Sequence, residues 1–116
     1  QDDDLATAKA AIEDRDFAGL DAVSEHSCRK MHSVMWASRP PLVYWNAATL
    51  RCMQAVRQMQ QDGCDVFFTI DAGPQLKAVC LPGSAADVAT VLGSTPGVQE
   101  VVECGLGAAA RLVETP

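Results

Sequence analysis

Positive charge is scarce in this chain of 116 residues. Nine lysines and arginines stand against fifteen aspartates and glutamates, which gives a formal net charge of −6 at pH 7. Nucleic acids and anionic membranes are bound mainly through basic protein surfaces. The sequence therefore predicts that neither nucleic acid nor a membrane is the main partner. The acidic run Asp2-Asp3-Asp4 is typical of a solvated helix start, where carboxylates favour the positive end of the helix dipole.

Long apolar runs are also missing. No stretch approaches the roughly 18 apolar residues that a membrane-spanning helix needs. The first residues are acidic, and they lack the basic-then-apolar order of a signal peptide. We therefore expect a cytoplasmic protein.

Closely spaced cysteines are the third absence. The five cysteines are odd in number, widely separated and include no C-x-x-C pair, so the spacing predicts neither a disulfide framework nor a zinc site. Most of them are expected to be small buried apolar residues. They are Cys28, Cys52, Cys64, Cys80 and Cys104.

The first half of the chain has the apolar spacing of helices, and the length suits a single domain. We expect helices over about 5–12, 17–37 and 47–62. Asp4 and Asn46 are the predicted N-caps of the first and third helices. The prolines at 40 and 41 break the chain between the second and third helices, and Gly63 suits the end of the third.

The second half is richer in strand patterns. Residues 65–70 and 76–81 are expected to form an antiparallel pair, because the connection between them is short. A fourth helix over 85–92, capped by Ser84, and a third strand over 98–104 should follow. Residues 108–114 fit either a helix or a final edge strand. The pattern predicts one α+β domain, with helices packed on one face of a mostly antiparallel sheet.

Asp71 is the residue for which a specific chemical role can be argued. It follows the apolar run 66–70 and precedes Ala72, Gly73 and Pro74. One interpretation is a turn residue, because aspartate often caps turns through its own backbone. The other is a functional acid, aimed by a strand end and followed by small residues that leave room for a ligand. Spacing alone leaves both interpretations open.

The other candidates for a site are weaker. The Gly105-Leu106-Gly107 segment could approach a phosphate, but no Walker or Rossmann pattern surrounds it, and a plain turn is favoured. His26 and His32 are six residues apart in one predicted helix, so they do not form an i, i+4 metal pair. Both are expected to be surface or hydrogen-bonded structural residues. Arg39 could face an anion, although a solvated loop arginine is the default.

Five segments in order give the chain a family resemblance. Together they resemble the C-terminal part of the diphosphomevalonate (mevalonate diphosphate) decarboxylases of the GHMP kinase superfamily. The D-A-G-P element is the most specific of them. The segments are Ala11-Ile12 with Arg15-Asp16-Phe17-Ala18, Met31-His32 with the run from Pro40 to Asn46, Phe68 to Pro74, Ser94-Thr95-Pro96-Gly97, and Gly105-Leu106-Gly107.

The resemblance implies the ferredoxin-like C-terminal fold of that superfamily and an enzyme that uses ATP and magnesium. Such an enzyme phosphorylates the 3-hydroxyl of mevalonate 5-diphosphate, and loss of phosphate and carbon dioxide then gives isopentenyl diphosphate. The family's catalytic aspartate maps onto Asp71, where it would accept or orient the hydroxyl proton. Ala72 and Gly73 would border the substrate. The resemblance also suggests a homodimer and assigns no metal ligand to this chain.

Three departures leave the choice of substrate open. The family commonly has Asn where this chain has Gln75, and Ser-Asn where it has Cys28-Arg29. It commonly has Pro where this chain has Ala108. The glycine- and serine-rich ATP loop of the family is absent from these residues, and the chain begins at Gln1 rather than Met. We therefore expect the C-terminal domain of a longer two-domain enzyme, inactive without its N-terminal domain. The alternatives are a related mevalonate or phosphomevalonate kinase or decarboxylase, or a non-catalytic binding or oligomerisation module.

Overall fold

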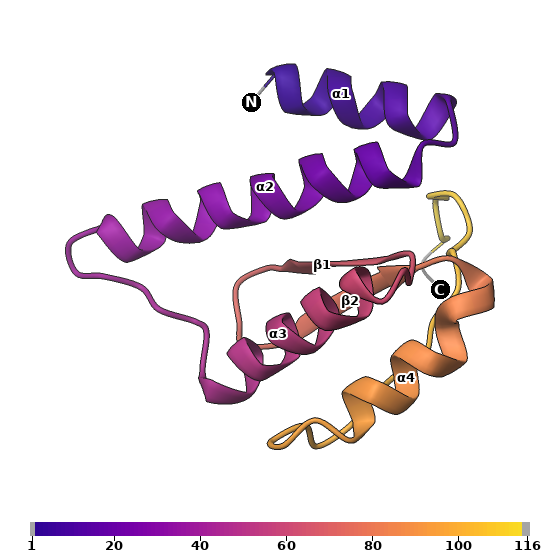
Figure 1. The fold of residues 1–116 in the computed structure, drawn as a ribbon. Coiled ribbons are helices and arrows are strands. Elements are labelled where there is room, and N and C mark those ends of the chain that lie inside the picture. The colour runs from indigo at the N-terminus through magenta and orange to yellow at the C-terminus, as the bar shows by residue number, and fades with distance from the viewer. Residues whose placement is uncertain (1, 115–116) are drawn as a thin grey trace.

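A computed structural model describes residues 2–114 of the chain, which form helices and one antiparallel strand pair (Figure 1). The elements are α1 (Asp2–Glu13), α2 (Phe17–Ala37), α3 (Ala47–Gln61), β1 (Val66–Ile70), β2 (Leu76–Cys80), a 3₁₀ turn η1 (Pro82–Ser84) and α4 (Ala85–Gly93). The predicted α+β class is confirmed. No helix within the described residues is long and apolar enough to cross a membrane.

The helix limits follow from capping residues. The Asp16 carboxylate accepts a hydrogen bond from the Gly19 amide at 3.0 Å, which caps α2. Asn46 caps α3 as predicted, and its side chain accepts from the Thr49 amide at 2.9 Å. Gly63 has φ +89°, which suits a residue just beyond a helix end. The prediction of Asp4 as an N-cap is wrong, because α1 already begins at Asp2.

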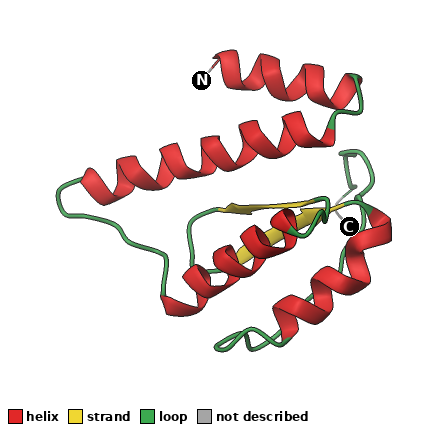
Figure 2. Cartoon of the chain, viewed as in Figure 1, coloured by secondary structure: helices red, strands yellow, loops and turns green. Residues whose placement is uncertain are grey.

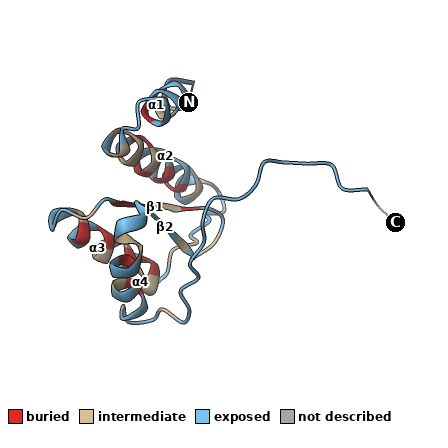
Figure 3. Ribbon diagram, turned by 90° about the vertical axis from the view of Figure 1, so that its right-hand side faces the viewer, coloured by how far each residue is buried: buried red, intermediate tan, exposed pale blue. Residues whose placement is uncertain are grey.

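The two strands are paired in register from Val66 opposite Cys80 to Ile70 opposite Leu76. The helices α2 and α3 pack against β1, and α4 packs against α3 and β2. The helix α1 packs on α2, away from the strands (Figures 2 and 3). The main hydrophobic core lies between the strands and the helices. Its buried members are Cys28, Cys52, Val56, Met59, Val66, Phe68, Ile70, Val88 and Leu92.

Side chains from the helices occupy the outer edge of β1. The Asp65 carbonyl accepts from the Leu81 amide, and in an antiparallel pair every second residue bonds to the partner strand. The carbonyls of Val66 and Ile70 therefore point away from β2. The Gln60 amide of α3 donates to the Val66 carbonyl at 2.9 Å. Two side chains of α2, Cys28 and His32, contact the Ile70 carbonyl. These side chains thus satisfy the carbonyl at each end of this edge.

The predicted third strand over 98–104 is wrong. Those residues form no strand, and 108–114 form neither a helix nor a strand. Residues 99–114 are exposed. Val101 still lies next to α4, 3.8 Å from where a Cβ would stand on Gly93, and the last part of the described segment runs away from the body of the domain (Figure 3). A strand needs the backbone groups of a neighbouring strand to complete its hydrogen bonds. Within the described residues only β1 and β2 are paired, so this segment lacks the ladder of hydrogen bonds that would make it a strand.

Candidate active site

Asp71 stands at the end of β1, as the first residue of the loop that connects β1 to β2. Its side chain is 73% exposed, so a ligand can reach the carboxylate from solvent. The Lys77 Nζ lies 2.7 Å from Asp71 Oδ2 and donates a hydrogen bond to it. Lys77 comes from β2, opposite Thr69 in the register. An ion pair this exposed contributes little stability, about 1 kcal/mol or less, so Lys77 can leave the carboxylate when a ligand arrives.

The small residues after Asp71 form a tight turn. The Gly73 amide donates to the Asp71 carbonyl at 3.0 Å, and Ala72 is exposed. A Cβ on Gly73 would lie only 2.3 Å from Oε1 of Gln75, so the Gln75 side chain folds over the glycine. The absence of a side chain on Gly73 therefore accommodates Gln75. A role for Ala72 and Gly73 in contacting substrate stays a prediction.

Buried side chains from two helices anchor the loop at both ends. At its start, His32 Nε2 lies 2.8 Å from the Ile70 carbonyl oxygen, and the Cys28 thiol donates to the same oxygen at 3.7 Å. At its end, the Thr49 hydroxyl donates to the Pro74 carbonyl at 2.8 Å. Asp71 therefore lies between two fixed carbonyls.

These contacts are the part of the site that sequence reasoning missed. The sequence predicts that both histidines are surface or hydrogen-bonded structural residues, and the structure leaves His26 exposed and buries His32 in a hydrogen bond. The available signal was the i, i+4 spacing of Cys28 and His32, which places both on one face of α2. Burial raises the pKa of the Cys28 thiol, so it stays protonated and serves as a weak donor.

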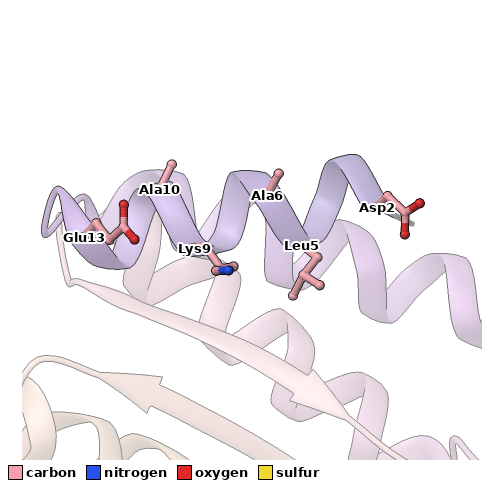
Figure 4. Close-up of a pocket in the computed structure, with 6 residues that line it drawn as sticks. All are labelled: Asp2, Leu5, Ala6, Lys9, Ala10 and Glu13. Carbon is pink, nitrogen blue, oxygen red and sulfur yellow. The ribbon is translucent and has the colours of Figure 1, made fainter.

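A groove of about 1000 Å³ opens beside Asp71, between α1, α2 and β1. Most of its lining is apolar, and Thr69 and Asp71 lie on its strand side. A second hollow runs along α1 and is lined by Asp2, Leu5, Ala6, Lys9, Ala10 and Glu13 (Figure 4). Asp2 and Glu13 stand near opposite ends of that helix, so their carboxylates do not converge on one ligand. The groove at Asp71 is the better candidate for a site.

The other residues that the sequence offered as site candidates do not form a common site with Asp71 within the described part of the chain. Gly105, Gly107 and Arg39 are exposed. No atom of the described residues lies within 4 Å of where a Cβ would stand on either glycine. Within residues 2–114, no three His, Cys, Asp or Glu side chains come together as a metal site would require. Asp71 instead faces the ammonium of Lys77. The described residues therefore do not fit a magnesium ion.

The fold and the loop define an α+β domain that presents the exposed Asp71 carboxylate at the end of β1, beside a groove. The chain belongs to the family of mevalonate 5-diphosphate decarboxylase C-terminal domains, because the model of that family matches residues 2–106. A search of curated proteins found no match.

Solved structures of mevalonate diphosphate decarboxylases are similar to this chain. The Staphylococcus aureus enzyme has a TM-score of 0.77 at 34% identity, over 80% of this chain and 28% of that one. The Enterococcus faecalis enzyme has a TM-score of 0.77 at 30% identity, over 83% of this chain and 30% of that one. The Streptococcus pyogenes enzyme has a TM-score of 0.74 at 29% identity, over 78% of this chain and 28% of that one. This chain thus spans less than a third of these relatives.

Proposed function

We propose that this chain is the C-terminal domain of an ATP-dependent diphosphomevalonate decarboxylase, and that Asp71 is its catalytic base. The observation that carries the proposal is the family match over residues 2–106, together with an exposed Asp71 held at a strand end beside a groove. The substrate is mevalonate 5-diphosphate. The E. faecalis relative is described as binding ATP by a mechanism that mevalonate diphosphate mediates.

Asp71 would act on the proton of the substrate's 3-hydroxyl. A carboxylate accepts that proton, or orients it, as the hydroxyl oxygen forms its bond to the γ-phosphorus of ATP and the bond to ADP breaks. The exposed carboxylate leaves space for a hydroxyl at hydrogen-bond distance. Lys77 keeps the carboxylate in place until the substrate hydroxyl replaces it as the partner.

The rest of the site lies on other residues of the complete enzyme. One solved relative is described in complex with MVAPP, AMPPCP and magnesium. Because residues 2–114 hold no cluster of metal ligands, we propose that the N-terminal domain binds ATP and magnesium. That domain would be the main protein partner of this one. We also propose a cytoplasmic homodimer, and the five free thiols agree with a reducing compartment.

Replacing Asp71 by Asn in the complete enzyme tests this role. The amide has nearly the same shape and cannot accept the proton, so we expect kcat to fall by roughly 10²- to 10⁴-fold while KM changes little. Phosphate and carbon dioxide release report the rate. Asp65→Asn is a matched control, because Asp65 is an exposed aspartate just before the same strand, at its other end.

Near-normal turnover by Asp71→Asn would show that Asp71 is a turn residue. An equal loss in Asp65→Asn would point to a general effect of removing charge from this hairpin. Product analysis separates the kinase alternatives, because a mevalonate or phosphomevalonate kinase releases no carbon dioxide. Competition between mevalonate, its monophosphate and its diphosphate separates a related decarboxylase from the proposed enzyme.

A further inference from the structure

The loop that carries Asp71 is held by two of the most deeply buried polar side chains of the domain. His32 is 1% exposed and Thr49 is 2% exposed. They come from different helices, α2 and α3, and each bonds to a backbone carbonyl at one end of the loop. A buried polar side chain lowers stability unless it is hydrogen-bonded. The question is therefore what these two hydrogen bonds contribute that an apolar side chain would not.

The His32 ring has one hydrogen-bond partner within the described residues. A carbonyl oxygen only accepts, so Nε2 carries the hydrogen that points to Ile70. Nδ1 is buried without a partner, and the ring packs against Trp45 at a centroid distance of 4.9 Å. An apolar side chain would suit these surroundings except for the bond to the Ile70 carbonyl. That bond is therefore what the imidazole contributes here.

The Thr49 hydroxyl joins the other end of the loop to the start of α3. It accepts from the Asn46 amide at 3.2 Å as part of the capping box, and it donates to the Pro74 carbonyl at 2.8 Å. The exit of the loop is thereby tied to a helix end that is itself capped. Ile70 and Pro74 bracket Asp71, so neither side of the loop can shift without breaking one of these bonds.

We propose that His32 and Thr49 are positioning residues, which hold the 71–74 loop so that the Asp71 carboxylate stays where it can take the substrate proton. The role rests on the proposed function of Asp71. Proton transfer requires hydrogen-bond geometry, and a displacement of about 1 Å can lower a rate by roughly 10²-fold. Among residues 2–114, the Asp71 carboxylate has one side-chain partner, the exposed Lys77, and such an exposed ion pair does little to fix its position.

The test compares His32→Leu with His32→Gln in the complete enzyme. Leucine fills much of the space but has no donor, so we expect kcat to fall by about 10- to 100-fold with KM nearly unchanged. Glutamine places an amide donor near the position of Nε2, and it should recover most of the loss. A His32→Leu enzyme with wild-type kcat per folded molecule would overturn the role of His32.

Thr49 offers a second pair, which stays informative if His32→Leu does not fold. Thr49→Ser keeps the hydroxyl, whereas Thr49→Val has the same shape without it. We expect Thr49→Val to lower kcat by about 10-fold or more and Thr49→Ser to stay close to wild type. Equal kcat in the two variants would overturn the role of Thr49.

Gln60→Leu separates positioning from general loosening. It removes the side-chain bond to the Val66 carbonyl, at the end of β1 away from Asp71. Urea unfolding of all variants shows whether their losses of stability are comparable. The proposal expects Gln60→Leu to keep kcat despite its lower stability. If Gln60→Leu lowers kcat as much as His32→Leu does, the effect is loosening and the proposal is overturned.

Asp71→Asn is measured in the same series. If Asp71→Asn loses rate while His32→Leu and Thr49→Val do not, the positioning roles fail and the function of Asp71 stands. If Asp71→Asn keeps its rate, the proposed function fails, and the positioning roles fail with it.

Discussion

Glu25 shows how single residues tie the helices of this domain together. It is 3% exposed, and its carboxylate accepts from Arg29 at 3.2 Å, Arg57 at 3.1 Å and Gln60 at 2.9 Å. Gln60 in turn bonds to the Val66 carbonyl of β1. One buried charge thus connects α2, α3 and the start of the strand whose end carries Asp71. Its bonds offset the loss of hydration.

Removing this carboxylate should destabilise the domain. In Glu25→Ala, the two arginines lose their partner but are about half exposed, at 46% and 49%, so water can solvate them. We therefore expect the free energy of unfolding to fall by about 1–3 kcal/mol, less than for a fully buried pair. Urea unfolding measures the change. Arg29→Ala is the control and should cost about 1 kcal/mol or less; equal losses in the two variants would contradict this account.

At the scale of elements, glycines with positive φ end two helical segments. Gly63 follows α3 with φ +89°, and Gly97 follows the turn after α4 with φ +92°. Their surroundings differ. No atom in the described part of the chain lies within 4 Å of a Cβ on Gly63, whereas a Cβ on Gly97 would stand 2.8 Å from the Cβ of Ala48 in α3. Gly97 therefore allows the turn after α4 to approach α3 closely.

Alanine substitutions separate backbone strain from packing. Gly63→Ala should cost about 1–3 kcal/mol, because alanine tolerates positive φ poorly. Gly97→Ala should cost more, because it adds a clash with Ala48. Thermal or urea unfolding of both variants measures the difference, which reports the packing contribution. If Gly63→Ala were as destabilising as Gly97→Ala, the close approach to α3 would have no energetic importance.

At the scale of the whole molecule, the domain exposes many large apolar side chains. Large apolar side chains are exposed on α1, on the loop before α3, beside β2 and along the terminal segment. They include Leu5, Ile12, Val43, Val79, Leu81, Val102 and Leu106. The N-terminal domain proposed above would cover part of this surface.

The isolated 116-residue chain should therefore show no turnover. Asp71 can accept a proton, but residues 2–114 show no metal cluster, and no phosphate-loop pattern is present in the sequence. We expect no ATP-dependent release of phosphate from mevalonate 5-diphosphate, and activity only when the N-terminal domain is present. Phosphate and carbon dioxide assays on both forms measure this. Turnover by the isolated chain would contradict the division of the site between two domains.

Local signals in the sequence were sufficient for most elements. Asp16 and Asn46 carry the side chains that cap helices, and the short connection from Asp71 to Gln75 leaves room only for an antiparallel pair. These features depend on neighbouring residues, so a linear sequence records them. The strand predicted over 98–104 was wrong because strand formation depends on a neighbour that apolar spacing does not reveal.

The sequence by itself determined the limits of α2 and α3, the β1–β2 hairpin and the place of Asp71 at a strand end, because each rests on residues close together in the chain. Tertiary structure alone decided what surrounds that aspartate. His32 reaches the Ile70 carbonyl across 38 positions, and Thr49 reaches Pro74 across 25. Contacts over such separations arise from packing of α2 and α3 against β1 and its loop. Helix spacing can place Cys28 and His32 on one face, but only the folded chain shows which backbone carbonyl that face meets.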